Sequence, residues 1–298
     1  MALQDQPAPR TISLRAQGRV ARRHMLSNAS RYLLLAASLV GVLALVVLLW
    51  DTVAVGAGRL SWGLVTNYPS RNADLAGLRS SILGSAWVVG LTIFMAIPVA
   101  VGTAIWMEEF APRGRVLTIV QLNVANLAGV PSIIYGILGL AIFVRLLGLG
   151  PSIFAGSLTL ALMILPMTVI ASSEAIRQVP PSIRDASLAL GATRWQTVWH
   201  HVLPGAMPGI MTGVILAIAR AVGETAALIM IGAFAFIAFD NTRPTQDFTT
   251  VPIQIYNWTI RPQQAFRENA AAAIILLLGA VIAMNLIAVL VRERFRRQ

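Results

Sequence analysis

Residues 174–204 read EAIRQVPPSIRDASLALGATRWQTVWHHVLP, and this stretch decides how the rest of the chain is organised. It is too polar to cross a membrane, yet a long apolar run lies on each side of it. Pro180 and Pro181 end the preceding helix, and Gly191 interrupts the segment near its middle. The pattern predicts a helix, a glycine turn and a second helix, held at one face of a membrane.

Two capping boxes mark the starts of these short helices: Asp185 follows Ser182 by three residues, and Gln196 follows Thr193 in the same way. Three uses fit such a hairpin. The segment could be a DNA-binding helix-turn-helix, it could be an interfacial hairpin that rests on lipid, or it could be a docking element that receives force from a soluble partner. A tether between two membrane spans cannot easily reach a DNA groove, which disfavours the first use.

The composition agrees with a membrane location. Of 298 residues, 57% are hydrophobic and 12% charged, and the mean hydropathy is +0.74. An ordinary soluble domain has about 45–50% apolar and about 25% charged residues, and disordered chains are poor in apolar residues. The chain has no cysteine, which excludes disulfides, thiolate metal sites and a cysteine nucleophile. We therefore expect a polytopic membrane protein.

Six apolar runs are long enough for membrane helices, each of which needs about 20 residues. We place these helices at about 32–52, 80–106, 117–144, 152–172, 207–234 and 270–291. A long basic lead precedes the first helix, and no clear small-residue cleavage site follows it. We therefore read this helix as an uncleaved anchor rather than a signal peptide.

The arginines predict the orientation. All 23 basic residues are arginine, and the net charge is +11, a balance that in a soluble protein suggests nucleic acid. With both termini inside, the inner segments 1–31, 107–117, 174–204 and 292–298 carry fifteen arginines and the outer segments seven. Positive charge favours the cytoplasmic side. We expect a multi-pass protein of the bacterial inner membrane with both termini cytoplasmic, lipid around it and no nucleic-acid partner.

Arg220 and Glu224 are the only charges firmly inside a predicted span. A charged side chain at the bilayer centre costs roughly 3 to 15 kcal/mol, so such residues usually have a function. Four residues apart on one helix, these two would share a face and form a pair. The pair either locks the fifth span to its neighbours or lines an ion path, to which Thr225 and Ser132 would add hydroxyl donors.

Other polar residues receive plainer interpretations. Asn123 and Asn126 are expected to hydrogen-bond between helices, and Glu108 and Glu109 to form a solvated cap at the membrane boundary. No metal site, cofactor or catalytic site is predicted. The sequence has no GxxxxGK[ST] phosphate loop, so the chain does not hydrolyse ATP by that route, and any ATP energy must come from a partner.

The hairpin resembles the EAA loop of permease subunits in ATP-binding-cassette importers. Asp185-Ala186-Ser187 stand at its start, Gly191 at its glycine and Leu203-Pro204 at its end, with intact spacing. Aspartate replaces the usual glutamate, Ser187 the second alanine, and His201 an aliphatic residue.

Further segments resemble the phosphate-importer permeases of the PstA type. They are GVPSIIYGILGL (129–140), LPMTVIASSEAIRQVP (165–180), ARAVGETAALIM (219–230) and VPIQIYNW (251–258), within a likeness that covers about residues 75–292.

The resemblance implies an all-α, six-helix type I importer permease of the MetI-like kind. Its parts would be a basic tail (1–31), a first helix (32–52), an outer loop (53–79), a permease domain (80–291, with coupling loop 174–204) and a second basic tail (292–298). It also implies four kinds of partner: a second permease chain (PstC-like, or less favoured a second copy), two ATP-binding subunits (PstB-like) and an extracytoplasmic phosphate-binding protein (PstS-like).

The implied function is phosphate import by alternating access. Arg220 would meet the anion transiently, and Glu224 would compete for Arg220 so that the anion can leave. Asp185, Ala186, Ser187, Gly191, Leu203 and Pro204 would couple the chain to the ATPase. The alternatives are a permease for molybdate, sulfate or phosphonate, and a proton-coupled secondary transporter. An intramembrane enzyme, which would need a nucleophile and a base on facing spans, is disfavoured because the chain has no cysteine and the spans have no histidine.

Overall fold

The computed structural model describes residues 19–233 and 236–296. The chain divides into two compact units, residues 1–51 and 52–298. In the first unit, the described residues belong to one long helix, α1 (Arg19–Gly56). The apolar side chains of residues 32–50 are exposed, and the most apolar stretch of Leu26–Arg59 has a mean hydropathy of 2.8. A long helix that is apolar on every side and exposed is suited to lipid.

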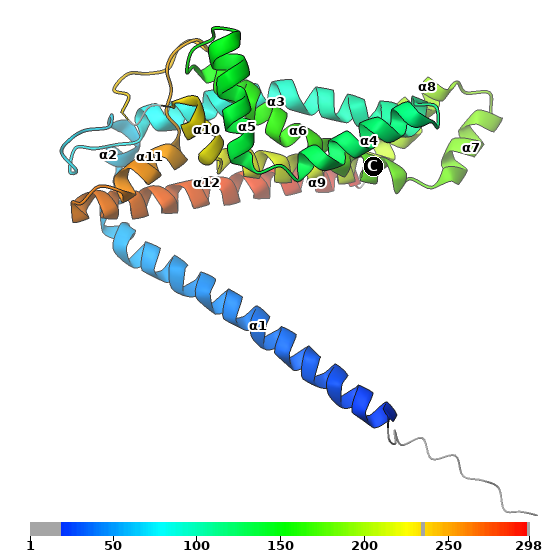
Figure 1. Cartoon of the computed structure of the whole chain (residues 1–298), viewed down its shortest axis with the longest axis horizontal. Coiled ribbons are helices and arrows are strands. Elements are labelled where there is room, and N and C mark those ends of the chain that lie inside the picture. Colours follow the sequence, from blue (N-terminus) through cyan, green and yellow to red (C-terminus); the bar gives the residue numbers. More distant parts are fainter. Residues whose placement is uncertain (1–18, 234–235, 297–298) are drawn as a thin grey trace, which may run out of the picture. The chain divides into compact units, whose positions relative to one another are not determined.

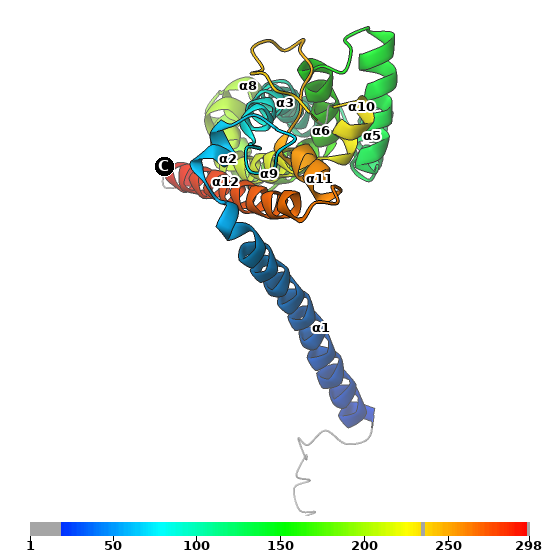
Figure 2. The same ribbon diagram turned by 90° about the vertical axis from the view of Figure 1, so that its left-hand side faces the viewer.

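In the second unit, four long helices run lengthwise in Figure 1, and Figure 2 views this bundle from one end. They are α3 (Arg79–Ile105), α6 (Ile153–Arg177), α9 (Leu203–Val222) and α12 (Gln264–Arg296). Helix α6 is central: 67% of its most apolar stretch is buried, and it packs between α3 and α9. With α1, these are the five helices of the described residues that are long and apolar enough to cross a membrane.

Small residues permit the close contact between α6 and α9. A Cβ added at Gly209 would lie 2.6 Å from the Ala175 Cβ, and one added at Gly213 would lie 2.5 Å from the Ala171 Cβ. Packing of this kind replaces the hydrophobic effect as the force that joins helices in lipid.

The predicted third span is bent. The structure has α4 (Arg115–Ala128) and, after a break at residues 129–131, α5 (Ser132–Gly139), which continues as a π-helix, η3 (Leu140–Leu146). The two parts meet at 103°, so six spans result only if this pair counts as one. Pro131 explains the break, since it lacks an N–H and disfavours helical backbone in the residue before it. Figure 1 shows α5 turned across the bundle.

The end of the bundle opposite the hairpin is built from short elements: η1 (Ala57–Arg59), α2 (Trp62–Thr66) and α11 (Val251–Thr259). Arg79 donates from Nε to Asp240 at 2.8 Å, which fixes the start of α3 to the loop after α10 (Ala226–Ile231). The pKa of Asp240 lies below its ordinary value, mainly because its carboxylate accepts the hydrogen bond from Arg79. This end is therefore tied by polar contacts as well as by packing.

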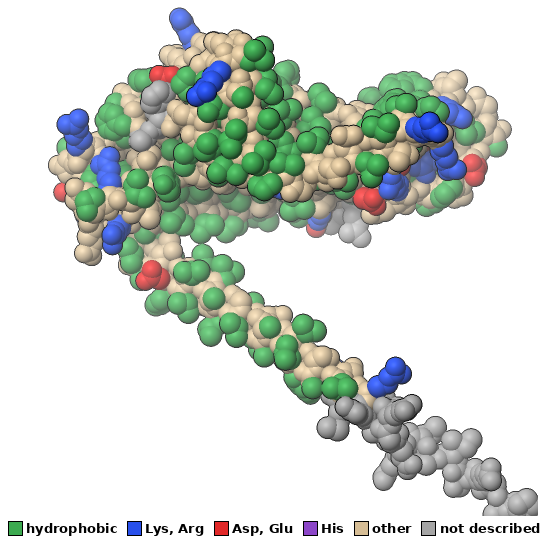
Figure 3. All heavy atoms as spheres, in the orientation of Figure 1, with side chains coloured by type: hydrophobic (Ala, Val, Ile, Leu, Met, Phe, Trp, Pro, Cys, Tyr) green, Lys and Arg blue, Asp and Glu red, His purple; other side chains and the backbone are tan. Residues whose placement is uncertain are grey.

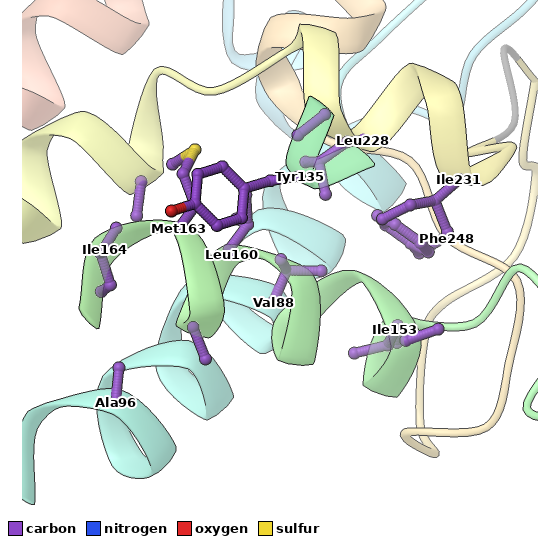
Figure 4. Close-up of a cluster of buried hydrophobic side chains, with 14 of the residues drawn as sticks. Val88, Ala96, Tyr135, Ile153, Leu160, Met163, Ile164, Leu228, Ile231 and Phe248 are labelled. Atoms are coloured by element: carbon purple, nitrogen blue, oxygen red, sulfur yellow. The ribbon is translucent and has the colours of Figure 1, made fainter. Parts of the chain in front are cut away.

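The main core lies where α3, α5, α6 and α10 meet. Figure 4 shows Tyr135 from α5 beside Met163 and Leu160 of α6, with Val88 of α3 and Leu228 of α10 close by. On the face drawn in Figure 3, hydrophobic side chains cover the middle of the bundle, and charged ones gather mainly toward its two ends. This is the distribution expected of a body surrounded by lipid.

Candidate functional site: a helical hairpin and two helix breaks

The hairpin has the predicted form. Helix α7 (Pro181–Ala189) is followed by a turn, by α8 (Arg194–Thr197) and by a π-helical stretch, η4 (Val198–Val202), which leads into α9. Gly191 lies in the turn with φ +87°, a backbone conformation that glycine adopts without the strain of a Cβ. The glycine predicted to break the segment therefore makes the reversal between the two helices.

One of the two predicted capping boxes is confirmed. The N–H of Gln196 donates to Thr193 Oγ1 at 3.3 Å, and the N–H of Thr193 donates to Gln196 Oε1 at 2.8 Å. The Ser182–Asp185 box is wrong, because α7 begins at Pro181 with Pro180 as its N-cap and no side-chain cap. Proline is favoured at the first helical position, where its missing N–H needs no partner.

Replacing Thr193 with alanine should loosen the start of α8. The change removes the acceptor for one N–H at the helix start, and a loss of this kind costs about 1 kcal/mol. A change of about 1.4 kcal/mol alters an equilibrium constant about tenfold, so about 1 kcal/mol alters the opening equilibrium of the helix about fivefold. We therefore expect amide hydrogen exchange in residues 194–197 to become about fivefold faster. Exchange in α6 serves as the internal control and should not change. Unaltered exchange in α8 would contradict the importance of this cap.

The predicted coupling residues lie in different surroundings. Asp185, Ala186 and Pro204 are exposed, and Leu203 is half-buried at the start of α9. Ser187 is buried, and its Oγ lies 2.9 Å from Thr197 Oγ1, so it joins α7 to α8 from inside the hairpin. A surface for a partner is offered instead by apolar side chains of α7 and the turn. Leu190 is 90% exposed, and Leu188 and Ile183 are also exposed.

Glu108 and Glu109 are not a solvated cap, as the sequence suggested. They lie on a π-helical end of α3, η2 (Trp106–Phe110), and their side chains are 13% and 10% exposed. Glu108 Oε2 accepts from Arg177 Nε at 2.8 Å, and Glu109 Oε1 accepts from Arg184 Nη2 at 2.6 Å. Their partners are distant in sequence, so no local pattern reveals these contacts.

Arg220 and Glu224 do not form the predicted pair. Helix α9 ends at Val222, and α10 begins only at Ala226, so the two side chains are not on one continuous helix. Glu224 Oε1 accepts from the N–H of Ala227 at 3.1 Å and thus caps α10. Arg220 is exposed, its Nη1 lies 3.7 Å from the Met167 sulfur, and none of the ion pairs within the described ranges includes it.

Thr225 and Ser132 lie at the two helix breaks. Thr225 is half-buried in the break before α10, and its hydroxyl donates to Gly223 O at 3.4 Å. Ser132 is half-buried and is the first residue of α5. Helices α5 and α10 are in close contact, because a Cβ added at Gly136 would lie 2.6 Å from Ala227 O. The two candidate hydroxyls therefore belong to elements that touch.

The hydrogen bonds to neighbouring helices that were predicted for Asn123 and Asn126 are not found in the described residues. Asn123 Nδ2 donates to Ile119 O of its own helix at 2.8 Å, and both asparagines are exposed on α4. The residue that holds this region is Tyr135, which sequence reasoning missed. It is buried, and its hydroxyl donates to Leu127 O at 2.8 Å, near the end of α4.

These contacts place two irregular stretches of backbone, residues 129–131 and 223–225, within predicted spans. Irregular backbone at membrane depth is tolerated where protein buries it or where it lines a water-filled cavity. Half-helices that end there also present backbone groups and dipoles that suit ions. The arrangement can therefore form one side of a polar path, with Arg220 as its exposed cation.

Comparison with known proteins identifies the family. Residues 75–297 match the family described as "Binding-protein-dependent transport system inner membrane component". The chain belongs to this family. It is a permease subunit of an ABC transporter, a multi-pass membrane protein, and not itself an enzyme. Proteins of this kind work with a second permease, an ATPase and a binding protein.

Two relatives resemble this permease over most of its length. It is 32% identical over 278 residues to the "Phosphate transport system permease protein PstA 1" of Mycobacterium tuberculosis (strain CDC 1551 / Oshkosh), covering 91% of this chain and 90% of that one. It is also 32% identical over 249 residues to the "Probable ABC transporter permease protein YqgI" of Bacillus subtilis (strain 168), covering 80% and 83%.

Solved structures confirm the fold of the permease. A chain of a bacterial ABC transporter involved in the import of the acidic polysaccharide alginate has a TM-score of 0.60 at 17% identity, covering 91% of this permease and 99% of that chain. A chain of the inward-facing MetNI methionine ABC transporter has a TM-score of 0.59 at 18% identity, covering 71% and 94%. The MetI-like bundle expected from the sequence is thus confirmed.

Proposed function

We propose that this chain is the transmembrane permease subunit of an ATP-driven importer of inorganic phosphate. The observation that carries the proposal is the 32% identity, across 91% of the chain, to a relative named as a phosphate permease. The hairpin supports the ATP-driven part, since it offers a partner an exposed apolar tip at one end of the bundle. The permease forms the path, and separate ATPase subunits supply the energy.

The partners follow from this role. A second, homologous permease of the PstC type covers the exposed face of α4 and completes the path. Two ATP-binding subunits of the PstB type engage the hairpins, and a phosphate-binding protein of the PstS type delivers the anion at the opposite end. ATP binding closes the ATPases, moves the hairpin and turns the cavity from inward-facing to outward-facing. This is alternating access by a bistable bundle.

The proposed orientation places the hairpin and both termini in the cytoplasm. The C-terminal end of α12 lies toward the hairpin end of the bundle, where Arg292 Nη1 donates to Thr212 Oγ1 of α9 at 3.1 Å. The excess of arginine on the segments next to the hairpin supports the same orientation. The short elements with η1, α2 and α11 then face the phosphate-binding protein.

Phosphate passes the helix breaks in this proposal. Arg220 offers a charge-assisted, bidentate contact to the anion, and the hydroxyls of Thr225 and Ser132 replace part of its hydration shell. Glu224, which caps α10, lies four residues from Arg220 and limits how tightly the anion is held. A weak, multi-contact path lets the ion leave as well as enter.

Radiolabelled phosphate uptake tests the proposal directly. Phosphate-starved cells that lack this gene and carry it on a plasmid should regain uptake, and excess sulfate or molybdate should not compete. Uptake should stop when ATP is depleted while the membrane potential is held. Competition by another oxyanion would reassign the substrate, and uptake that survives ATP depletion would favour a proton-coupled carrier using Glu224.

Replacing Leu190 with aspartate should prevent the ATPase from binding. The side chain is 90% exposed at the hairpin tip, and burying it in a partner groove would contribute about 2 kcal/mol, whereas burying an unpaired carboxylate there is strongly unfavourable. We expect the ATPase co-purified with the permease to fall at least tenfold, as about 2 kcal/mol implies. Leu190→Met, which keeps an apolar side chain, should bind normally. Equal recovery of the ATPase with both variants would show that Leu190 is outside the contact.

A further inference from the structure

We propose that Glu109 and Arg184 form a positioning joint, a contact that transmits movement of the hairpin to α3 and α6. Without this contact, ATP would still be hydrolysed, but the hydrolysis would no longer drive phosphate transport. The inference rests on the proposed function, because it concerns how that importer couples its two activities. Both residues act through the elements they connect rather than by touching the substrate.

The joint is a fork-shaped contact between two elements. Arg184 on α7 donates from Nε to Glu109 Oε1 at 3.0 Å and from Nη2 to the same oxygen at 2.6 Å. The side chains are 22% and 10% exposed, so water competes weakly for these bonds. Glu109 belongs to η2, the π-helical end of α3. Two charge-assisted bonds from one planar guanidinium fix direction as well as distance.

The same guanidinium also holds the end of α6. Arg184 Nη1 donates to Val179 O at 2.6 Å, and Nη2 donates to Ile176 O at 3.0 Å. These carbonyls lie in and just after the last turn of α6, and the Ile176 oxygen also accepts from the N–H of Val179 at 3.2 Å. One side chain on α7 therefore hydrogen-bonds to the ends of both α3 and α6.

Neighbouring contacts strengthen the joint. Glu108 on η2 pairs with Arg177 of α6 at 2.8 Å, so η2 and α6 are also bonded directly. The Phe110 ring of η2 lies 6.1 Å from the Trp195 ring of α8, and Trp195 stacks on Trp199 of η4 at 5.9 Å. Helical stretches of the π type often mark functional sites, and both η2 and η4 meet here.

No buried apolar side chain of α7 packs it against α3 within the described residues, so the ion pair is not simply one contact of a hydrophobic core. Within the described residues of α7, only Ser187 is buried, and it faces Thr197 of the hairpin itself. Figure 1 shows α7 beyond the ends of the long helices. Partly buried ion pairs contribute little net stability, whereas they can specify one geometry. Arg184 therefore supplies a direct hydrogen-bonded connection from the first helix of the hairpin to the ends of α3 and α6.

The experiment compares transport with ATP hydrolysis in the complete importer reconstituted in proteoliposomes. For Glu109→Ala, Arg184→Ala and the double variant, we expect phosphate transported per ATP hydrolysed to fall about tenfold, within the range typical of coupling between sites. The double variant should fall no further than either single one, because all three remove one contact. Glu109→Gln should stay within about twofold of wild type, since its Oε1 accepts the same two bonds.

Glu174→Ala is the matched control. This carboxylate also pairs with an arginine of the region, Arg177, but it is exposed and lies within α6 itself. Its ratio of phosphate to ATP should equal that of wild type. If the alanine variants at Glu109 and Arg184 lower transport and ATP hydrolysis in proportion to the amount of assembled complex, their role is merely structural and the joint is refuted.

A second readout does not depend on the substrate. The chain has no cysteine, so a single cysteine can be placed at position 223, in the exposed break beside Arg220 that lines the proposed path, and labelled with a maleimide. A Cβ added there has only ordinary contacts, the nearest at 3.8 Å. In the wild-type background, ATP should change the labelling rate, and Glu109→Ala should abolish this change while ATP is still bound. A retained change would overturn the joint. If the wild-type importer carries another oxyanion, the proposed substrate fails, and the labelling still decides whether the joint exists.

Discussion

Replacing Gly84 with alanine is expected to remove most of the folded permease from the membrane. An added Cβ would lie 2.0 Å from the backbone oxygen of Thr249 and 3.5 Å from Asn241 Oδ1. A backbone atom in a packed region cannot move aside cheaply, so α3 and the segment before α11 would have to separate. Overpacking of this kind costs roughly 3 kcal/mol or more, a large share of the stability of a typical domain.

The contacts around Gly84 show what this separation would break. Ser85 Oγ accepts from the N–H of Val251 at 2.9 Å, and Ser80 Oγ donates to Ile237 O at 2.7 Å. Both bonds join α3 to the segment that follows α10, and both are close to Gly84 on the same helix. Losing them would leave polar groups without partners in a buried region, which adds to the steric cost.

Gly90→Ala is the control, because a Cβ added there meets nothing within 4 Å and alanine is the better helix former. The measurement is the amount of complex recovered after mild detergent extraction, with protease resistance as a second probe. We expect Gly90→Ala to match wild type and Gly84→Ala to yield little resistant protein. Equal yields would show that the segment at Thr249 moves more freely than its contacts indicate.

Replacing Arg220 with alanine is expected to reduce phosphate transport at least tenfold. The guanidinium is exposed at the end of α9, beside a helix break, and it has no acid partner among the ion pairs of residues 19–233 and 236–296. An unpaired charge inside a predicted span is costly, so its retention indicates a function. Removing a charge-assisted contact to an anion loses about 1.5 to 3 kcal/mol, which corresponds to the expected decrease.

The rates are measured in proteoliposomes with saturating phosphate-binding protein, and ATP hydrolysis is followed in parallel. Arg220→Lys should fall between wild type and alanine, because lysine keeps the charge and loses the bidentate geometry. Arg145→Ala, which removes an exposed arginine at the far end of η3, should transport normally. Wild-type rates and selectivity in Arg220→Ala would show that the anion passes elsewhere.

The spans and the hairpin could be predicted because they depend on local patterns. Apolar length identifies membrane helices, and the sequence around Gly191 and the Thr193–Gln196 box specifies the turn and the second short helix without reference to the rest of the chain. Pro131 indicates a break in the helix at residues 129–131, but the sequence alone does not predict the angle between the two parts. The local pattern also favoured one continuous helix through Gly223, which the structure breaks.

Contacts between distant segments could not be predicted. Glu108 lies 69 residues from Arg177, and Glu109 lies 75 residues from Arg184. A lone sequence gives no pairing across such separations, so its local pattern predicts only a solvated cap for two acids at a membrane boundary. The predicted ion pair between Arg220 and Glu224 was wrong for the opposite reason. Their spacing was right for a pair, but the pair required a helix that ends at Val222.

The bend between α4 and α5 has a consequence for how the cell treats this protein. Gly129 and Pro131, the first and last residues of the break, are exposed in the single chain, and hydrocarbon cannot form hydrogen bonds to irregular backbone. A copy inserted without its permease partner therefore presents a defect that quality-control proteases of the membrane can recognise. We expect such orphan copies to be degraded, so that the ratio of the two permeases is set after synthesis by which copies find a partner.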